Sequence, residues 1–467
     1  MSRAREGSAV VSGPVPGAFF LGQPLAYDLA ALGYSNEEFL LEGTARSYAP
    51  AAGEARYRTR AVVRRPLDPA RFNGSVVVEW FNVSGGLDAA PDWSFVHRHL
   101  IREGFAWVGV SAQRVGIEGG GVTALSFPLK KVDAKRYGSL AHPGDAFSFD
   151  IFSQAGRAVQ GGRLLGGLAP RRVLAIGESQ SAMFLVTYVN AVDAEARVFD
   201  GFLLHGRGGG GASLEGSIGM TRASLAEAAA AVSSGRGPSP HMAGSERIRS
   251  DVRVPVLTLQ SETDVVGLGS AAARRPDSDR FRLWEIAGAA HADTYLLVAS
   301  VADDGSLPPA ALAKLLAPTT ELLGMKVDAP INSGPQQHYV LQTALSHLDR
   351  WAAGGAPPPE APRLALVDGA NPLALDALSI AKGGIRSPWV DAPTAVLSGF
   401  GQSGTEFAFL FGTTRPFDAA TLARLYPGGR PDFLARFQKA TDEAVACGFL
   451  LEADAPEIRA LAGLTAW

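Results

Sequence analysis

Six short apolar runs separated by helical stretches constrain the fold of this chain more than any other feature. A strand that is buried on both faces has no solvated side, so its sequence is apolar almost throughout. Strands of this kind that alternate with helices are typical of a mostly parallel sheet with helices on both faces. We therefore predict the α/β class. The runs comprise residues 75–80, 106–111, 172–176, 199–204, 254–259 and 281–286.

The segments around these runs complete the expected architecture. Residues 39–47 and 57–63 alternate partly between apolar and polar side chains, which predicts antiparallel strands with one solvated face. The longest connections all follow the carboxyl ends of the predicted parallel strands, where open α/β sheets bind their ligands. We therefore expect a covered pocket at this edge of the sheet. Helices are expected at residues 93–103, 147–160, 181–192 and 336–351, and the long connections are residues 81–92, 112–144, 205–250 and 287–332.

The segment Gly177-Glu178-Ser179-Gln180-Ser181 lies between an apolar strand and a helix. A strand, a tight turn and a helix in this order form a nucleophile elbow, which exposes a serine hydroxyl at the end of a sheet. The turn requires small residues two before and two after the serine, and Gly177 and Ser181 meet this requirement. Ser179 is therefore the predicted nucleophile, and the alternative is that it only caps the helix.

A nucleophilic serine needs a histidine base and a carboxylate that orients the base. After a nucleophile elbow, the acid and then the histidine each follow a later strand. Asp264 follows the run at 254–259, and His291 follows the run at 281–286 on a Gly-Ala-Ala loop. We predict these two residues as acid and base, with a core or surface position as the alternative for His291. Glu262 is the alternative acid, because it follows the same strand two residues earlier.

The oxyanion that forms during acyl transfer needs backbone N–H donors. One donor is expected to be the amide of Gln180, at the start of the helix after Ser179. The second donor usually comes from the loop after an earlier strand, which is residues 81–86 in this chain. We expect the amide of Asn82 or Val83 to supply it.

Four other histidines have weaker claims to the site. His205 ends a predicted strand on the active-site side, so we expect it to line the pocket and touch the substrate. His142 lies in a long loop, where it either lines the pocket or caps the following helix. His97 and His99 lie on a predicted amphipathic helix, and we expect both at the surface.

The sequence contains no pattern that is typical of a metal or nucleotide site. It lacks a His-Glu-x-x-His motif and cysteine clusters, and its glycine tracts at 119–121 and 208–211 lack the strand-then-helix context of a phosphate loop. We therefore expect neither a metal nor a cofactor. The single cysteine, Cys447, excludes an internal disulfide, and its apolar surroundings predict a buried structural thiol.

The charge of the chain argues against several kinds of partner. The formal net charge is −3, and no run of Lys and Arg exceeds the pair Lys130-Lys131, so we expect no nucleic-acid or anionic-membrane surface. No apolar stretch is long enough to span a membrane. The N-terminus lacks the apolar core of a secretory signal, so the protein is either cytoplasmic or has lost a signal peptide. A small-molecule ester is the expected partner, and the oligomeric state stays open.

The length of 467 residues predicts more than one compact unit. Residues 14–205 and 251–354 form the predicted core, residues 206–250 a lid or cap insertion, and residues 355–467 a C-terminal extension on or near the core. The insertion leaves the active-site end of a strand and carries an Ala-rich helix. This position favours a lid over a decorative surface insertion. Whether the extension is a small appended domain or a second flap over the site stays open.

Six motifs are long enough to compare with known families, and they lie at residues 76–86, 107–113, 137–145, 177–181, 260–265 and 287–293. Through these motifs the chain resembles a bacterial family of α/β-hydrolase domain proteins, from about Gly13 to the C-terminus. The resemblance implies the α/β-hydrolase fold. It supports Ser179, Asp264 and His291 position by position, and it implies no particular substrate.

The motifs together predict a carboxylic ester hydrolase that works through a Ser-His-Asp triad and an acyl-enzyme intermediate. Lactones, thioesters and amides are alternative substrates, because fold and triad are compatible with all of them, and a non-catalytic binding protein is the alternative of another class. Only neutral imidazole accepts the serine proton. We therefore expect activity to fall below about pH 6 to 7, where histidine ordinarily titrates.

Overall fold

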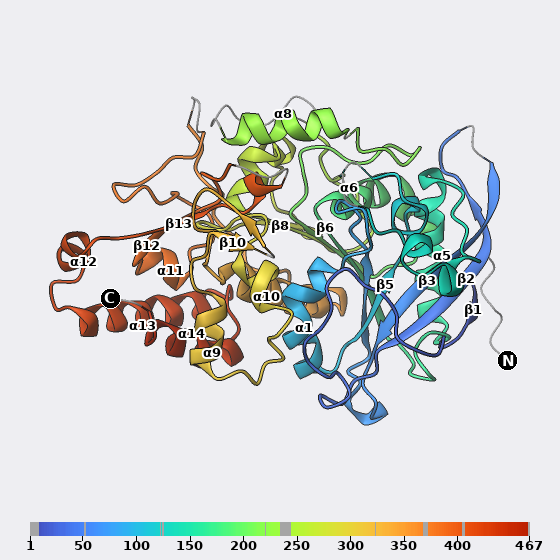
Figure 1. Cartoon of the computed structure of the whole chain (residues 1–467), viewed down its shortest axis with the longest axis horizontal. Helices are drawn as coiled ribbons and strands as arrows, with labels where there is room; N and C mark the ends of the chain where they lie inside the picture. The colour runs from blue at the N-terminus through green and yellow to red at the C-terminus, as the bar shows by residue number, and fades with distance from the viewer. Residues whose placement is uncertain are drawn as a thin grey trace.

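The structure of the chain is a computed structural model, which describes residues 9–465 except 51–52, 122, 124–125, 220, 234–243, 323, 368–371 and 404–406. A nine-stranded sheet forms its centre, in the order β1-β2-β3-β5-β4-β6-β7-β8-β9 (Figure 1). The strands are β1 (Val10–Ser12), β2 (Glu37–Arg46), β3 (Glu54–Arg64), β4 (Ser75–Trp80), β5 (Ala106–Val110), β6 (Arg172–Glu178), β7 (Gly201–His205), β8 (Val256–Gln260) and β9 (Phe281–Glu285).

Strands β4 to β9 run parallel to one another, and β1 to β3 form an antiparallel edge. Every residue of β4, β5, β7, β8 and β9 is buried. This burial explains why these segments are apolar, since a strand covered on both faces has no place for a solvated side chain. Strand β2, by contrast, keeps exposed positions along its length. The predicted mostly parallel sheet with antiparallel strands before it is confirmed.

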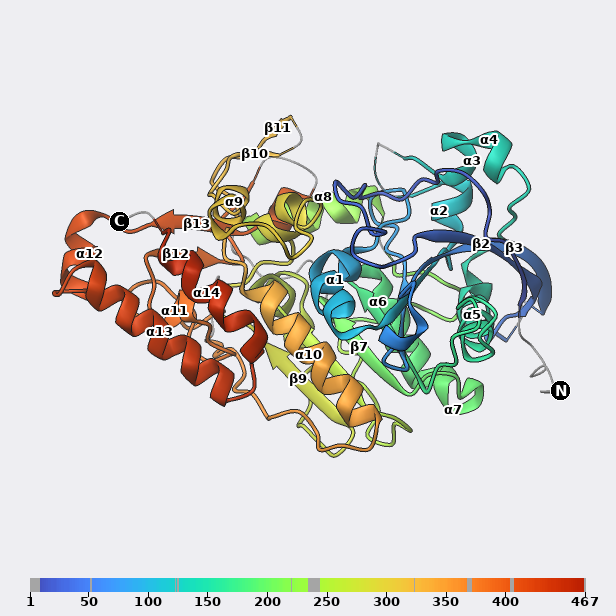
Figure 2. The ribbon, with the colours of Figure 1, turned by 90° about the horizontal axis from the view of Figure 1, so that it is seen from below.

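Helices cover both faces of the sheet and bury a separate core on each side. Helices α1 (Pro91–Glu103) and α10 (Gln336–Ala352) lie side by side on one face (Figure 2). Helices α5 (Ser148–Gln160) and α6 (Gln180–Thr187) pack against the other face. Alternate residues of one strand enter the two cores: Val77 packs with α1 and α10, and Val76 with α5 and α6. The period of two along a strand produces this division.

The smaller elements lie in the connections and in the C-terminal part of the chain. Across the described residues, no helix is both long and apolar enough to span a bilayer. The further helices are α2 (Arg114–Glu118), α3 (Leu129–Val132), α4 (Ala134–Tyr137), α7 (Asp193–Ala196), α8 (Arg222–Ser233), α9 (Pro309–Leu315), α11 (Pro388–Asp391), α12 (Ala419–Leu425), α13 (Arg430–Ala446) and α14 (Ala455–Ala462). The further strands are β10 (Glu321–Leu322), β11 (Met325–Lys326), β12 (Ala395–Ser398) and β13 (Thr413–Pro416).

The C-terminal extension packs directly on the core. Ile385 continues the hydrogen bonding beyond β9, since its amide donates to the Glu285 carbonyl and its carbonyl accepts from the Ala287 amide. Arg98 on α1 forms an ion pair of 2.7 Å with Glu457 on α14. The apolar faces of α13 and α14 belong to the same core as α10. Because these contacts are extensive, the described residues after 355 form one packed body with the sheet.

The connection after β7 begins with a glycine tract that folds around one buried arginine. The Arg207 guanidinium donates to the carbonyl oxygens of Gly208, Gly209, Gly210 and Glu246, over 2.8 to 3.2 Å. Burial lowers the pKa of this arginine to about 10. The tract is therefore a packed turn, and a Cβ at Gly209 would clash with the Gly244 carbonyl oxygen, so the close approach of the backbone requires glycine there.

Helix α8 of the same insertion lies along the upper edge of the molecule in Figure 1. It contacts the π-helical turn Thr263–Gly267, which carries Asp264, and the 3-10 turn Ala408–Leu410 of the C-terminal extension. Ala229 of α8 packs with Leu268 and Phe409. Residues 234–243 of the predicted lid lie outside the described residues.

The expectation for Cys447 is wrong, because the thiol is exposed. The buried stripe of α13 consists of Phe433, Phe437, Ala440, Thr441 and Ala444. The helix ends at Ala446, and the chain then turns at Gly448, whose φ is +77°. Cys447 therefore lies past the last helical residue, where the apolar stripe no longer faces the core.

Candidate active site

The turn between β6 and α6 places Ser179 at the end of the sheet. Ser179 has φ of 57° and ψ of −117°, an unusual backbone conformation for a residue with a side chain. The Ser181 hydroxyl closes the turn by donating to the Glu178 carbonyl at 2.8 Å, and it accepts from the Glu178 amide at 3.0 Å. A Cβ at Gly177 would lie 3.0 Å from Leu185 Cδ1. Steric contact therefore explains the small residue at Gly177, and hydrogen bonding within the turn explains the one at Ser181.

Ser179, Asp264 and His291 come together at the carboxyl edge of the sheet. His291 Nε2 lies 2.9 Å from Ser179 Oγ, and His291 Nδ1 lies 2.6 Å from Asp264 Oδ1. Both Asp264 and His291 are buried, and Ser179 is half-buried. The other carboxylate oxygen of Asp264 accepts from the Ser261 amide at 2.6 Å, which fixes its orientation.

Glu262, the alternative acid, has other partners. Its Oε1 accepts from the Gly288 amide at 2.6 Å, and its Oε2 accepts from the Gly399 amide at 2.8 Å. Burial raises the pKa of Glu262 to about 7, although both amide hydrogen bonds lower it. This carboxyl therefore joins the histidine loop to the C-terminal extension, and of the two candidate acids only Asp264 contacts His291.

The loop that carries His291 is held by several groups from other elements. The His291 amide donates to Thr263 Oγ1 at 3.2 Å, and the His291 carbonyl accepts from Gln337 Nε2 on α10 at 3.2 Å. Gly206 lies against the imidazole, and a Cβ at this position would approach its Nδ1 and Cε1 to 3.2 Å. Gly206 also has φ of +61°, so a side chain there would be strained as well as crowded. The imidazole position is thus set by groups that are distant in sequence.

Glu178 also contacts the histidine, which the sequence motifs did not predict. Its Oε1 lies 2.9 Å from His291 Nε2, and its Oε2 accepts from Asn82 Nδ2 at 3.0 Å. In the sheet Glu178 is paired with His205 of β7. The only sign of this contact in the sequence is the acidic residue directly before Ser179. The direction of its side chain depends on how the turn folds.

Two carboxylates change the expected titration of the base. Burial alone lowers the pKa of His291, but Glu178 and Asp264 outweigh burial and raise this pKa to about 10. The expectation that activity falls below about pH 6 to 7 therefore needs correction. Neutral imidazole forms only above the raised pKa, so activity should be lost at a higher pH than for an ordinary histidine.

The predicted oxyanion donors differ in their availability. The Asn82 amide donates to the Ala89 carbonyl at 3.0 Å, so it is already used, and the Asn82 side chain binds Glu178 instead. The Val83 amide donates a longer hydrogen bond, of 3.4 Å, to Gln180 Oε1, which places this loop beside the start of α6. Among the described residues, no carbonyl oxygen accepts from the Gln180 amide. The Gln180 amide is therefore the more available donor, and the Val83 amide is the better second candidate because its present hydrogen bond is longer than that of the Asn82 amide.

His205 does not face the pocket as expected. It is 1% exposed, and its Nδ1 lies 2.9 Å from Asp92 Oδ1. Burial lowers the pKa of His205 to about 4 and, together with the charge of Glu178, raises the pKa of Asp92 well above its usual value. Helix α1, which carries Asp92 and Phe95, covers the histidine, and the Phe95 ring packs edge-on against it. The side chain therefore lies next to Glu178 and under α1, with almost no surface open to solvent.

The three other histidines considered for the site, His97, His99 and His142, are all buried. His142 is buried, its Nε2 lies 2.8 Å from the Ala112 carbonyl, and its Nδ1 accepts from the Gly144 amide, just before a 3-10 turn. His97 and His99 were expected at the surface, and that expectation is wrong, since both are buried. Helix α1 is also covered on the side that does not face the sheet. There His97 Nε2 lies 2.5 Å from the carbonyl oxygen of Asp303, which is distant in sequence. The amphipathic pattern of α1 could not indicate this second layer.

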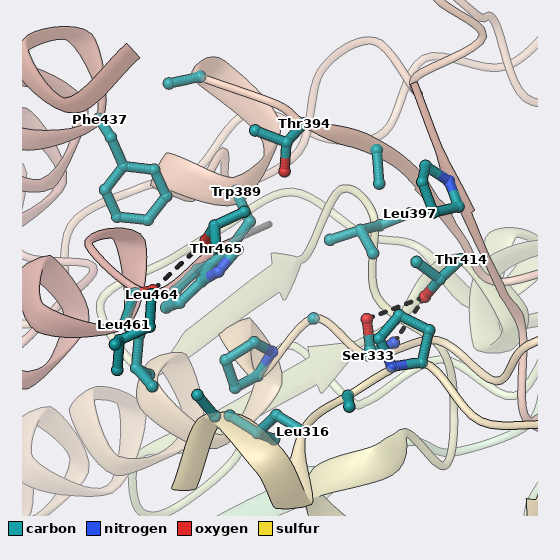
Figure 3. Close-up of a pocket in the computed structure, with 18 of the residues that line it drawn as sticks. Leu316, Ser333, Trp389, Thr394, Leu397, Thr414, Phe437, Leu461, Leu464 and Thr465 are labelled. Carbon is teal, nitrogen blue, oxygen red and sulfur yellow. Dashed lines mark hydrogen bonds between the residues drawn. The ribbon is translucent and has the colours of Figure 1, made fainter. Parts of the chain in front are cut away.

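A cavity of about 320 Å³ lies between α9, the C-terminal helices and the β12–β13 hairpin (Figure 3). Its walls are largely apolar, and among the described residues that line it none belongs to the Ser179 site. No group of three or more His, Cys, Asp or Glu side chains within the described ranges is arranged to hold a metal. The residues that line the cavity and are labelled in Figure 3 are Leu316, Ser333, Trp389, Thr394, Leu397, Thr414, Phe437, Leu461, Leu464 and Thr465.

Several solved structures are similar to this chain at low sequence identity. XC6422 from Xanthomonas campestris, a serine hydrolase without a lid, is 13% identical, with 52% of this chain and 82% of that chain covered and a TM-score of 0.29. The glucuronoyl esterase from Solibacter usitatus is also 13% identical, with 54% and 76% covered and a TM-score of 0.29. A thermostable esterase from Pseudomonas putida ECU1011 is 16% identical, with 53% and 70% covered and a TM-score of 0.27. None of the curated proteins compared with the chain matches it.

One family description matches nearly the whole chain. The description reads "Alpha/beta hydrolase domain", and the match extends over residues 6–460. It therefore includes the complete sheet, the turn that carries Ser179 and most of the C-terminal extension. The mostly parallel sheet with helices on both faces agrees with this description. The chain belongs to the alpha/beta hydrolase domain family.

Proposed function

We propose that the protein is a serine hydrolase of carboxylic esters. The observation that carries the proposal is the line of contacts from Ser179 Oγ to His291 Nε2 at 2.9 Å and from His291 Nδ1 to Asp264 at 2.6 Å. A serine hydroxyl is a weak nucleophile unless a positioned base takes its proton. The half-buried Ser179 at the tip of a strained turn has such a base, and the base has a carboxylate that selects its tautomer.

The reaction that fits this geometry has two halves. His291 takes the Ser179 proton as Oγ bonds to the ester carbonyl carbon, and the amides of Gln180 and Val83 bind the oxyanion. The imidazolium then donates its proton to the leaving alcohol oxygen, and an acyl-enzyme remains. Water activated by the same histidine releases the acid. Asp264 stabilises the imidazolium in both halves.

A fluorophosphonate probe tests the proposal directly, because it phosphonylates only a serine that a base activates. We expect the wild-type protein to be labelled on the peptide that contains Ser179, as measured by mass spectrometry. Ser300→Ala is a matched control, since the buried Ser300 hydroxyl donates to the Leu296 carbonyl of the turn just before it, and this variant should be labelled like the wild type. An unlabelled wild-type protein would instead indicate a binding protein with this fold.

We further propose that α8 and the chain around it form a lid that sets the acyl-chain preference. The contact of α8 with the turn that carries Asp264 supports this proposal. Replacing residues 221–243 by a short Gly/Ser linker should shift the preference within a panel of aryl esters from acetyl to lauroyl, and should change the thermal midpoint little. The replaced segment excludes Arg207 and Glu246, whose contacts hold the base of the insertion. A folded variant with an unchanged chain-length profile would contradict the lid.

A further inference from the structure

His291 Nε2 has two oxygen neighbours at the same distance. Ser179 Oγ and Glu178 Oε1 both lie 2.9 Å from it. The Glu178 side chain is 7% exposed, and its second oxygen is held by Asn82 Nδ2 at 3.0 Å. Asn82 also donates to the Glu178 backbone carbonyl at 3.0 Å, so one amide side chain fixes both ends of the glutamate. The carboxylate is therefore oriented towards the histidine by a built contact.

The number of protons in this site follows from the contact. With the Nδ1 proton directed at Asp264, a neutral imidazole presents a lone pair at Nε2, and an ionised carboxylate presents only lone pairs. Two acceptors that lie 2.9 Å apart repel each other unless one of the two groups carries a proton. The resting arrangement of Glu178 and His291 thus contains one more proton than a Ser-His-Asp site in which Nε2 is free to accept.

We propose that Glu178 is a positioning residue for the reaction proposed above: it retains one extra proton on the pair that it forms with His291, and this proton must leave before Ser179 can be activated. The proposal rests on the proposed function, since it assigns a role in that reaction. Loss of the proton to solvent frees the Nε2 lone pair. The Ser179 proton then moves to Nε2 as Oγ bonds to the carbonyl carbon, and it leaves with the alcohol oxygen when the carbon–oxygen bond breaks.

Glu178 therefore has two opposite effects on the rate. It makes His291 a stronger base and stabilises the imidazolium that forms when Ser179 is deprotonated. It also lowers the fraction of enzyme that is ready to react at neutral pH, because the extra proton is bound more tightly. The enzyme should be slow near neutrality and become faster as the solution is made alkaline.

The other titratable groups around the pair do not cancel the charge of Glu178. Asp264 approaches from the turn after β8 and adds a second negative charge on the opposite ring nitrogen. His205 on β7 lies beside Glu178, and burial lowers its pKa to about 4, so it is neutral at physiological pH. Asp92 on α1 lies on the far side of His205, with its Oδ1 2.9 Å from His205 Nδ1, and burial raises its pKa well above the usual value.

The first experiment compares the pH dependence of kcat/KM for 4-nitrophenyl acetate between about pH 5 and about pH 10. Glu178→Gln keeps the size and the Asn82 contact but removes the charge. We expect its acid limb to lie at least about one pH unit below that of the wild type, with a lower plateau at high pH. The two profiles should cross, which a loss of folded protein cannot produce. Glu178→Asp, with the charge retained on a shorter side chain, should lie between them.

Glu79→Gln is the matched control for loss of a buried carboxylate in the same sheet. Glu79 lies on β4 and accepts from Asp92, Trp93 and Trp107, with no contact to His291. Its substitution should leave the position of the acid limb unchanged, whatever it does to stability. An acid limb of Glu178→Gln that coincides with that of the wild type would overturn the proposal, provided that Ser179 is labelled and active.

A second measurement does not depend on ester hydrolysis. The imidazole resonances of His291, identified by their loss in His291→Gln, can be followed by NMR over the same pH range. We expect a higher titration midpoint in the wild type than in Glu178→Gln or Glu178→Asp. Equal midpoints would overturn the role of Glu178 even if the enzyme is an esterase. A higher midpoint in the wild type of a protein that hydrolyses no ester would still support the extra proton on Glu178 and His291. It would overturn only the proposed reaction.

Discussion

Ser179→Ala is expected to lower kcat/KM for an aryl ester by about 10⁴- to 10⁶-fold. The variant removes the only oxygen that lies both at the tip of the turn and 2.9 Å from His291 Nε2 among the described residues. The turn itself should persist, because Ser181 and the Glu178 backbone hold it through hydrogen bonds that do not use the Ser179 hydroxyl. Steady-state kinetics together with a thermal unfolding curve measure both effects.

The control for this variant is Ser300→Ala, which removes a buried serine hydroxyl that donates to the Leu296 carbonyl and not to a residue of the site, and which should keep the wild-type rate. Activity of Ser179→Ala within tenfold of the wild type would remove this serine from the mechanism. A variant that fails to unfold cooperatively would place the loss in the fold instead, and Ser179→Cys, with a similar shape and a stronger intrinsic nucleophile, would then decide between the two.

Asp264→Asn is expected to reduce kcat by about 10³- to 10⁴-fold. The asparagine amide can present an N–H to His291 Nδ1, which favours the tautomer with its proton on Nε2. That tautomer cannot accept the proton of Ser179. The 2.6 Å contact between Asp264 and His291 makes this substitution sensitive, because the two atoms must share one hydrogen. Single-turnover kinetics with an aryl ester measure the effect on acylation directly.

Glu262→Gln is the matched comparison, since Glu262 follows the same strand and is equally buried. Its two oxygens accept from the Gly288 and Gly399 amides, and a glutamine would place an N–H₂ group against one of these donors. We expect a loss of about 1–3 kcal/mol in the free energy of unfolding and a much smaller loss of kcat than for Asp264→Asn. If the glutamine variant were the inactive one, the acid assignment would have to move to Glu262.

Local pattern was enough to predict the layers of this fold. Residues such as Val76, Val77 and Val78 are apolar because the strand is covered on both faces, and that coverage is a property of every parallel strand with helices on both sides. The same holds for the order of Ser179, Asp264 and His291 along the chain. Each follows a strand of one parallel sheet, so topology alone brings the three to one edge.

The tertiary structure decided what lies next to each of these residues. The direction of Glu178, the position of His205 next to it and the use of the Asn82 amide by Ala89 depend on contacts between elements that are far apart in sequence. The burial of His97 has the same origin, since an amphipathic pattern indicates one covered face of a helix and gives no information about a second layer. The expectation for Cys447 was wrong in the opposite sense, since a residue expected to be buried is exposed. Helix α13 ends at Ala446, one residue too early to bury the thiol. Sequence periodicity thus determined which elements form and at which edge the chemistry gathers, and long-range packing determined the charge and hydrogen-bond partners of the base.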